Sequence, residues 1–503
     1  MKKYLFILII ILSTMVVQSQ SKDDFTNITI DQEITEVQPM TGIVYWQESS
    51  YPNTDAISLE FSYMLFNDIV SDSGVYDWTA VEEKLADIAS RNHQAIFRFR
   101  YTYVGEETSV PDYIKARPDY HETMGLSEGE ETWFPDWTNE ELKRFSLDFY
   151  TQFAARYDHD PRLAFIQVGF GLWGEYHIYD GPFELGVTFP SKEFQMTFFS
   201  HLQNVWHNKY WSISVDAADD TYSPIEEHPD MLNIVFGLFD DSFMAEEHAQ
   251  YNELNWNFFG RDRYQMAPAG GEFSYYTSWD QHHVLDLPNG AHGESFESFA
   301  ERFHITYMIG ADQPEYQTNA RIKQASMATG YRFKIVSFKA SADSSIIEII
   351  NEGSAPIYYD AFPTVNGVRA AESLKYLDHN TTKTFYIPSG GSEPVFSIES
   401  DDILEGQNIG FYGTLNSAVG EIENTSKLAD VYPNNVKKGD LIHIQTQSNQ
   451  KMDLEFYQLS GQLIISDTFV NHYNLSSKKL MPGMYILKIK YDDLVQTNKV
   501  IIR

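Results

Sequence analysis

The chain has 503 residues, of which 43% are hydrophobic and 15% aromatic, which excludes an intrinsically disordered protein and allows two or three domains. Its 36 Lys and Arg against 72 Asp and Glu give a formal net charge of −36, which argues against binding to nucleic acid or anionic lipid. A local basic pocket would still admit an anionic substrate. The sequence has no cysteine, so neither disulfides nor thiolate metal sites are expected.

The N-terminus has the pattern of a secretory signal peptide, which we place at residues 1–19. Lys2 and Lys3 form a short basic region, residues 4–17 are apolar, and a cut is predicted near Gln20. The apolar run is short for a membrane span and no later segment is long enough, so no span is predicted. An uncleaved membrane anchor is the alternative. The sequence therefore predicts an exported protein, either secreted or attached to the cell surface.

Residues 37–333 alternate apolar, strand-like runs with helical patterns. The eight runs are 42–46, 57–66, 95–101, 164–170, 211–217, 232–239, 264–273 and 305–310. Helical patterns cover 78–92, 139–157, 191–208 and 320–329. This alternation predicts an α/β fold, a TIM-like (β/α)8 barrel. The connection 47–56 is too short and polar for a helix, so we expect a distorted barrel.

The pattern of apolar and turn-forming residues changes after Arg332. Residues 334–417 contain short β-type runs separated by Gly, Ser, Asn and Pro turns, which predicts an all-β sandwich. Such a sandwich would either buttress the barrel or extend its cleft. Residues 418–430 are polar and acidic, as in a linker.

Residues 431–503 form a further β-rich segment, predicted to be a small β-sandwich. It carries Tyr432-Pro433-Asn434 at its start, Gly461 in a predicted hairpin turn, residues 482–485 (PGMY) before a strand, and Lys499 near its end. The segment resembles the sorting domain that Bacteroidota use for type IX secretion. The resemblance implies that the type IX machinery is a partner and that the protein is exported. The alternative is an accessory β-sandwich.

Two glutamates end apolar runs at the points where Gly- and aromatic-rich loops begin. Glu175 lies in LAFIQVGFGLWGEYH, and Glu272 lies in YQMAPAGGEFSYY. The carboxyl ends of barrel strands converge on one pocket, and cleavage of a glycosidic bond requires a pair of carboxyl groups. We therefore predict that these two residues are catalytic. The alternatives are a loop glutamate that caps a helix or binds an arginine, and a buried structural ion pair.

The strand positions and segment 74–100 resemble the large clan of retaining (β/α)8 glycoside hydrolases that includes β-galactosidases, agarases and mannanases. The chain also resembles secreted Bacteroidota proteins that join a hydrolase-like barrel to a small β-sandwich. The resemblance implies that Glu175, after the fourth strand, is the acid/base. It implies that Glu272, at the end of the seventh, is the nucleophile.

The chain departs from the pattern of that clan at two places. Gly174 stands where an Asn usually precedes the acid/base, and Phe236 and Phe239 stand where the clan commonly supplies a Tyr from the sixth strand. These departures leave open whether the enzyme would retain the configuration at the anomeric carbon. They also leave a second function open, that of a non-catalytic surface protein that binds carbohydrate or mediates adhesion on a hydrolase-like barrel.

Arg98 and Arg100 alternate with Phe97 and Phe99, so the two arginines share one face of their strand. If the phenylalanines pack against helices, the arginines point into the barrel, where a buried arginine needs carboxylate partners. Three roles remain open: orienting the nucleophile, as the resemblance implies, binding a substrate carboxylate or sulfate, or forming a structural salt bridge.

Further candidates for substrate binding lie in the loops after the strands. Aromatic rings can stack on sugar rings, although each ring could instead belong to the hydrophobic core. The aromatic candidates are Trp173, Tyr176, Tyr275, Tyr276 and Trp279. We favour Trp173 and Trp279, because each lies within a few residues of a candidate carboxylate in the sequence. Histidines of the same loops are His177, His282, His283 and His292. Aspartates after the fifth and sixth strands are Asp216, Asp219, Asp220, Asp240 and Asp241. From these sets, His177, Asp216 and Asp240 complete the predicted site.

No organic cofactor is predicted. The aspartates could bind a structural Ca²⁺, although no EF-hand spacing is present. The sequence lacks a phosphate-binding Gly-rich loop, HExxH and GxSxG, which excludes nucleotide-binding, zinc-peptidase and α/β-hydrolase functions. The sequence thus predicts a secreted glycoside hydrolase of a poly- or oligosaccharide, and it does not specify the sugar, the linkage, endo or exo action, or the oligomeric state.

Overall fold

The structure is a computed structural model, and it describes residues 25–413, 428–446, 449–458, 463–491 and 494–503. The chain divides into two compact units, residues 1–415 and 416–503. The predicted signal peptide and most of the predicted linker lie outside the described residues.

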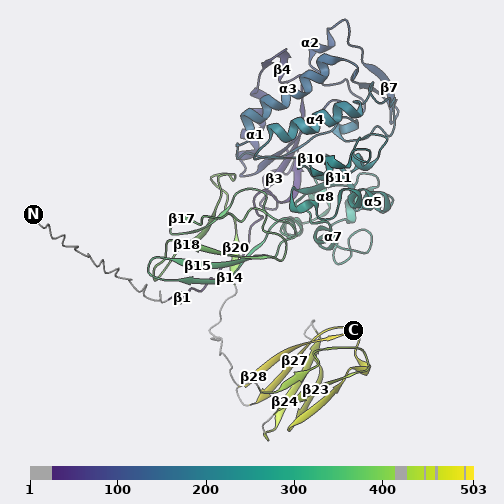
Figure 1. Ribbon diagram of the computed structural model, residues 1–503. Coiled ribbons are helices and arrows are strands. Elements are labelled where there is room, and N and C mark those ends of the chain that lie inside the picture. Colours follow the sequence, from purple (N-terminus) through teal and green to yellow (C-terminus); the bar gives the residue numbers. More distant parts are fainter. Residues whose placement is uncertain (1–24, 414–427, 447–448, 459–462, 492–493) are drawn as a thin grey trace, which may run out of the picture. The chain divides into compact units, whose positions relative to one another are not determined.

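A closed barrel of eight parallel strands dominates the first unit (Figure 1). Around the barrel the strands are β2 (Gly42–Trp46), β3 (Leu59–Leu65), β6 (Gln94–Arg100), β9 (Leu163–Gln167), β10 (Tyr210–Ser214), β11 (Gly237–Phe243), β12 (Ala269–Phe273) and β13 (Tyr307–Ile309). Each predicted strand is present, so the predicted fold class is confirmed. The sixth strand begins later than expected because Pro229–Asn233 form a 3-10 turn, with Pro at a position that favours helical entry.

Helices pack around the barrel (Figure 1). The four predicted helices are α1 (Thr79–Ala89), α3 (Glu140–Tyr157), α4 (Lys192–Val205) and α9 (Asn319–Ser326). The others are α2 (Asp112–Lys115), α5 (Ala249–Phe259), α6 (Ser278–His283), α7 (Phe296–Phe303) and α8 (Gln313–Tyr316). Residues 47–58 contain no helix, as expected. Two short hairpins, β4–β5 and β7–β8, lie in the connections; their strands are Val70–Asp72, Val75–Tyr76, Thr123–Ser127 and Glu130–Phe134.

Helix α3 shows how local sequence builds this outer layer. Asn139 caps its N-terminus, because the side-chain oxygen accepts hydrogen bonds from the amides of Glu141 and Leu142. An aromatic stripe along the helix then packs inward, and Phe149 and Phe153 contact Phe99 of β6. Since Phe99 faces the helices, the arginines that alternate with it face the barrel interior.

A β-domain completes the first unit. One sheet has the order β1-β14-β15-β18 with β20 beside β14, and a second has the order β17-β16-β19. The strands are β1 (Thr26–Asn27), β14 (Phe333–Ala340), β15 (Ser345–Asn351), β16 (Phe362–Val365), β17 (Val368–Arg369), β18 (Thr382–Ile387), β19 (Phe396–Glu399) and β20 (Phe411–Gly413). They enclose a separate apolar core. The N-terminal strand β1 therefore belongs to this domain and not to the barrel.

The β-domain contacts the end of the barrel at which the strands begin. Tyr358 and Tyr359 share an apolar cluster with residues of the barrel strands, including Phe165. The Tyr358 hydroxyl donates to the carbonyl of Tyr264 at 2.6 Å, and that of Tyr359 donates to the carbonyl of Ala164. This contact supports the barrel from the end opposite to Glu175 and Glu272.

The second unit is a small β-sandwich with its own core. One sheet has the order β21-β23-β26 and the other β22-β28-β27-β24-β25. The strands are β21 (Asp430–Tyr432), β22 (Asn435–Val436), β23 (Leu441–Gln445), β24 (Met452–Gln458), β25 (Leu463–Phe469), β26 (His472–Ser476), β27 (Gly483–Tyr491) and β28 (Leu494–Ile502). Across the described part of the chain, no helix has the length and apolar character needed to cross a membrane.

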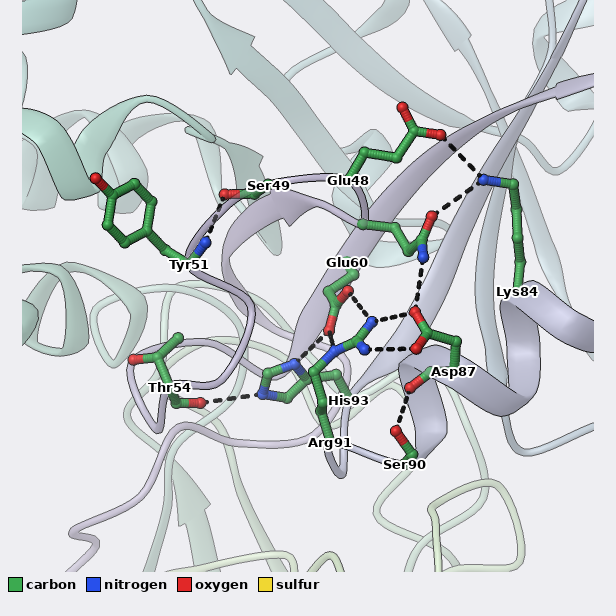
Figure 2. A network of polar contacts seen from close by, with 11 residues as sticks. Glu48, Ser49, Tyr51, Thr54, Glu60, Lys84, Asp87, Ser90, Arg91 and His93 are labelled. Atoms are coloured by element: carbon green, nitrogen blue, oxygen red, sulfur yellow. Dashed lines mark hydrogen bonds and ion pairs between the residues drawn. The ribbon is translucent and has the colours of Figure 1, made fainter.

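A buried ion network fixes the start of β3 to the segment that follows α1 (Figure 2). The fully buried Glu60 accepts two hydrogen bonds from Arg91, at 2.7 and 2.8 Å, and lies 2.7 Å from Nδ1 of His93. Arg91 also binds Asp87 of α1. Both carboxylates are therefore neutralised at the end of the barrel that lacks the candidate site.

We expect Glu60→Gln to lower the free energy of unfolding of the barrel unit by about 3–5 kcal/mol, because it leaves buried cationic partners uncompensated. Urea unfolding of the full chain, followed by tryptophan fluorescence, measures this. Glu48→Gln is the matched control, since Glu48 is exposed and pairs only with Lys84, and should cost less than about 0.5 kcal/mol. Equal midpoints for the two variants would contradict the importance of the network.

Candidate active site

Glu175 is positioned by a loop that folds back on itself directly after β9. The amides of Phe170 and Gly171 donate to the carbonyl of Glu175 at 3.0 and 2.8 Å, and the amide of Leu172 donates to the carbonyl of His177 at 3.0 Å. A Cβ on Gly171 would overlap the His177 carbonyl oxygen, so no larger residue fits there. The glycines of GFGLWGEYH therefore allow the backbone contacts that aim Glu175.

The conformation of Gly174 explains why this chain has no Asn before Glu175, unlike the glycoside hydrolase clan that it resembles. Its φ of +70° is a conformation that favours glycine, and a Cβ would lie 3.2–3.3 Å from the side chains of Arg98 and Arg100. An Asn side chain at this position would have to displace the stems of both arginines. In this chain the space is filled by arginine instead.

Arg98 lies inside the barrel, as the alternation along its strand predicts. Its Nη1 donates to Oε1 of Glu175 at 2.7 Å and its Nε donates to Oε1 of Gln167 at 2.8 Å. The guanidinium lies against the rings of Phe239 and Phe61, 4.4 and 5.2 Å from their centroids. Its side chain is fully buried. This geometry makes Arg98 a fixed positive charge in a nearly water-free environment, where its field is strong.

Arg100 has a different role from Arg98. Its Nη2 lies 2.5 Å from Oε2 of Glu106, and its guanidinium stacks over the ring of Tyr103 at 4.3 Å. Within the described residues, Arg100 thus pairs with Glu106 and not with Glu175 or Glu272.

Glu272 lies on β12 with 8% of its surface exposed, and its Oε1 is buried with no hydrogen-bond partner in the described residues. Burial raises the pKa of Glu272 to about 7; Arg98 opposes the shift, while Asp241 and Asp312 add to it. Arg98 interacts electrostatically with both Glu175 and Glu272. The structure therefore brings both predicted glutamates into the field of one guanidinium.

Glu175 is 4% exposed, and its pKa is raised well above the usual range. Burial is the largest cause, and the carboxyl group of Asp241, which is hydrogen-bonded to it, is the next. Arg98 and His177 act in the opposite direction. Burial and Asp241 therefore favour the protonated form of Glu175.

His177 and Asp216 form an ion pair next to Glu175. Nδ1 of His177 lies 2.6 Å from Oδ2 of Asp216, and Nε2 lies 3.8 Å from Oε2 of Glu175. Burial alone would lower the pKa of His177, but Asp216 raises it to about 10. Burial alone would raise the pKa of Asp216, but His177 and the hydroxyl of Ser214 lower it. His177 is therefore an imidazolium at neutral pH.

The structure corrects one predicted contact, because Asp241 and not Asp240 reaches the site. The carboxylate of Asp240 accepts hydrogen bonds from Asn252 and Trp256 of α5, at 2.8 and 2.9 Å. Successive residues of a strand face opposite sides, so Asp240 faces the helix layer while Phe239 and Asp241 face inward. The pKa of Asp240 is raised to about 8, first by burial and then by Asp241.

The described residues contain one group with the ligand types and spacing of a metal site. Single ligand atoms of Glu175, His177 and Asp241 lie within 4.8 Å of one another. The guanidinium of Arg98 already contacts Glu175 and would repel a cation. We therefore assign no metal to this group. A Ca²⁺ site elsewhere stays an untested prediction.

The predicted aromatic residues divide between exposed positions and the core. Tyr275 and Trp279 are 48% and 56% exposed, and Tyr275 interacts electrostatically with Glu272. Trp173 is partly buried and stacks on Tyr179. Tyr176 is fully buried and donates to Gln195 of α4. Tyr176 is thus a core residue, and the predicted sugar contact does not fit it.

The remaining loop histidines lie in other contacts. His292 binds Asp280 of α6, His283 stacks on Trp279 with ring centroids 3.8 Å apart, and His282 lies against Tyr316. None of these contacts includes Glu175 or Glu272.

Two site residues escaped the sequence analysis as individual candidates. Tyr63 of β3 accepts a hydrogen bond from Arg98 at 3.4 Å, and its pKa is raised first by burial, with Glu175 and Glu272 adding. The sequence alone does not single out Tyr63, because it lies within the apolar run 57–66. Asp241 was grouped with its neighbours, and only the strand alternation that makes Phe239 face inward would have selected it over Asp240.

Comparisons with known proteins identify the C-terminal domain by a family model, whereas the rest of the chain is similar only to distant structures. Residues 430–503 match the family model of the secretion system C-terminal sorting domain, so the chain carries an export signal of the type IX kind at its C-terminus, close to the predicted bounds. This supports a secreted or surface location. No curated protein matches the sequence.

Solved structures similar to this chain include several carbohydrate-active enzymes. A γ-cyclodextrin glucanotransferase (γ-CGTase) from alkalophilic Bacillus clarkii has 8% identity and a TM-score of 0.29, with 93% of this chain and 84% of that chain covered. A GH36 α-galactosidase from Geobacillus stearothermophilus has 9% identity and a TM-score of 0.32, with 69% and 55% covered. A β-galactosidase from Halorubrum lacusprofundi has 9% identity and a TM-score of 0.33, with 57% of each covered.

The chain therefore spans only a little over half the length of these two galactosidases. Since all three TM-scores lie below 0.5, function has to be inferred from the geometry of the site. The fold and the site together define a (β/α)8 barrel with a cluster of buried carboxyl groups around one arginine, in a chain that carries a C-terminal sorting domain.

We expect Asp216→Asn to lower the pKa of His177 from about 10, because the variant removes the carboxylate that holds the imidazolium. The His177 ring proton signal in NMR spectra should be independent of pH between about 6 and 8 in the wild type and should titrate there in the variant. Asp219→Asn is the matched control, because Asp219 caps a nearby turn without contacting His177. An unchanged signal in Asp216→Asn would contradict the pairing.

Proposed function

We propose that this protein is a secreted glycoside hydrolase that cleaves a poly- or oligosaccharide with Glu175 and Glu272. The observation that carries the proposal is the pair of carboxyl groups, from the β9 loop and from β12, that share the field of the buried Arg98. Both side chains are buried, with exposures of 4% and 8%. The exposed rings of Tyr275 and Trp279 add a surface on which a sugar can stack.

The protonation states support one division of roles. Glu175, whose pKa is raised by burial and by Asp241, would donate a proton to the departing glycosidic oxygen. Glu272, with a pKa of about 7, would attack the anomeric carbon in its ionised form. Water would then give a proton to Glu175, attack the same carbon and release Glu272. Retention of configuration is part of this proposal and requires carboxyl groups about 5–5.5 Å apart.

A second division of roles follows from the contact between Glu175 and Asp241. These two carboxyl groups are hydrogen-bonded, so Asp241 is a candidate for the second catalytic carboxyl in place of Glu272. The variants that test the first proposal distinguish the two.

The charges around the site favour a neutral sugar. Arg98 is paired with Glu175 and Arg100 with Glu106, so the charge of each predicted cation is already partly offset, although one nitrogen of each guanidinium has no partner in the described residues. Glu272 and Asp241 add negative charge when ionised. An anionic sugar ring would therefore enter against like charges in a low-dielectric pocket.

We expect Glu175→Gln and Glu272→Gln each to lower kcat by about 10²–10⁴-fold on a substrate found by screening a panel of glycans. Azide should restore cleavage of an activated aryl glycoside by Glu272→Ala, because it replaces the missing nucleophile. Glu247→Gln, an exposed position six residues after Asp241, is the control. If Glu272→Gln stays active while Glu175→Gln and Asp241→Asn do not, Asp241 is the second carboxyl. If all variants match the wild type, the carbohydrate-binding alternative is favoured.

We expect neutral glycans to be cleaved with a kcat/KM at least about tenfold higher than that for matched sulfated or uronic acid forms, because like-charge contacts cost several kcal/mol. Added salt should narrow the gap, since it screens the charge of the pocket rim. Preferential cleavage of the anionic forms would contradict the pairing of both arginines.

A further inference from the structure

The carboxyl groups of Glu175 and Asp241 meet inside the barrel mouth although they come from different strands. We propose that Asp241 is a positioning residue that shares one proton with Glu175 and keeps it on the pair until a glycosidic oxygen accepts it. The inference rests on the proposed function, in which Glu175 is the acid.

The geometry requires a proton between these groups. Carboxyl oxygens of both side chains lie within 4.8 Å of each other and of a ring nitrogen of His177, and Asp241 raises the pKa of Glu175 by its charge and by a hydrogen bond. Two ionised carboxylates in such contact repel each other strongly, and neither can donate a hydrogen bond. One proton shared by the pair removes the repulsion and supplies the donor.

The strand itself places Asp241 in this position. The pairing of β11 with β12 shifts register between Asp240 and Phe243, and such a bulge re-aims the side chains beside it. Phe239 lies over Arg98, Asp240 binds α5, and Asp241 points toward Glu175. A strand end that bulges next to the acid is consistent with a local requirement for this carboxyl group.

The surrounding charges favour one proton on the pair and neither zero nor two. Burial and the negative charge of Asp216 raise the pKa of Asp241, while His177 and Arg98 lower it. The charged and titratable groups that face the pair are Tyr63 of β3, Arg98 of β6, His177 of the Glu175 loop, Asp216 after β10 and Glu272 of β12, while Asp240 of β11 acts on it from the helix side.

Sharing a proton also serves both steps of the reaction. After Glu175 gives its proton to the leaving oxygen, Glu175 and Asp241 are both negative, and their repulsion makes Glu175 a stronger base. Glu175 then takes a proton from the attacking water more readily. The proton returns to the pair, and the starting state is restored.

The first test is the pH profile of kcat/KM for Asp241→Asn, with Asp241→Ser as a second variant and Glu247→Gln as the control. Without the neighbouring carboxylate, Glu175 should lose its proton at lower pH, so the alkaline limb of the profile should move to lower pH in both variants and stay in place in the control. A reduced rate with an unshifted alkaline limb would overturn the inference, because it would reflect only a structural effect.

The second test needs no substrate. A carboxyl whose pKa is raised on folding contributes stability below its unfolded pKa of about 4, and this contribution is lost as pH rises through its folded pKa. As the pH rises from about 4 to about 8, the free energy of unfolding of Asp241→Asn should therefore increase relative to that of the wild type. A difference that is constant with pH would overturn the inference. If this trend appears and no glycan is cleaved, the shared proton stands and the proposed function fails.

Discussion

The hydrogen bond that Arg98 donates to Glu175 organises the mouth of this barrel. Arg98 is fully buried, and a charge without partners there would cost several kcal/mol, so its surroundings must supply carboxylates and fixed dipoles. Glu175 and Gln167 provide them directly, and Glu272 does so through space. The position of the arginine thus constrains three strands at once. Such a network is more a source of preorganised charge than of net stability.

Around this pair the remaining groups form a graded set of proton affinities. Asp216 is ionised and holds His177 as an imidazolium, while Glu175 shares its proton with Asp241 and Glu272 has a pKa near neutrality. Burial raises the pKa of every carboxyl here, and the partner of each group decides how much of that shift remains. Groups with separated proton affinities in one pocket are characteristic of acid–base chemistry.

The two ends of the barrel differ in a way that fits this division. At the end where the strands begin, the Glu60 network and the tyrosines of the β-domain have complete sets of partners. At the other end, buried polar atoms of Arg98 and Glu272 lack partners within the described residues. Single unpartnered atoms also occur at the first end, on Gln94 and Thr306, so it is the clustering of titratable groups around Arg98 that distinguishes the candidate site.

The sequence by itself determined the eight strands and the position of the two glutamates at strand ends, because apolar period and turn residues are local signals. The C-terminal sorting domain followed from its resemblance to known sorting domains. The inward direction of Arg98 also followed, from its alternation with phenylalanines. Only the tertiary structure decided that Tyr176 packs in the core and that Arg100 pairs with Glu106. Those outcomes depend on which neighbouring strand, loop or helix a side chain meets, which no local pattern encodes.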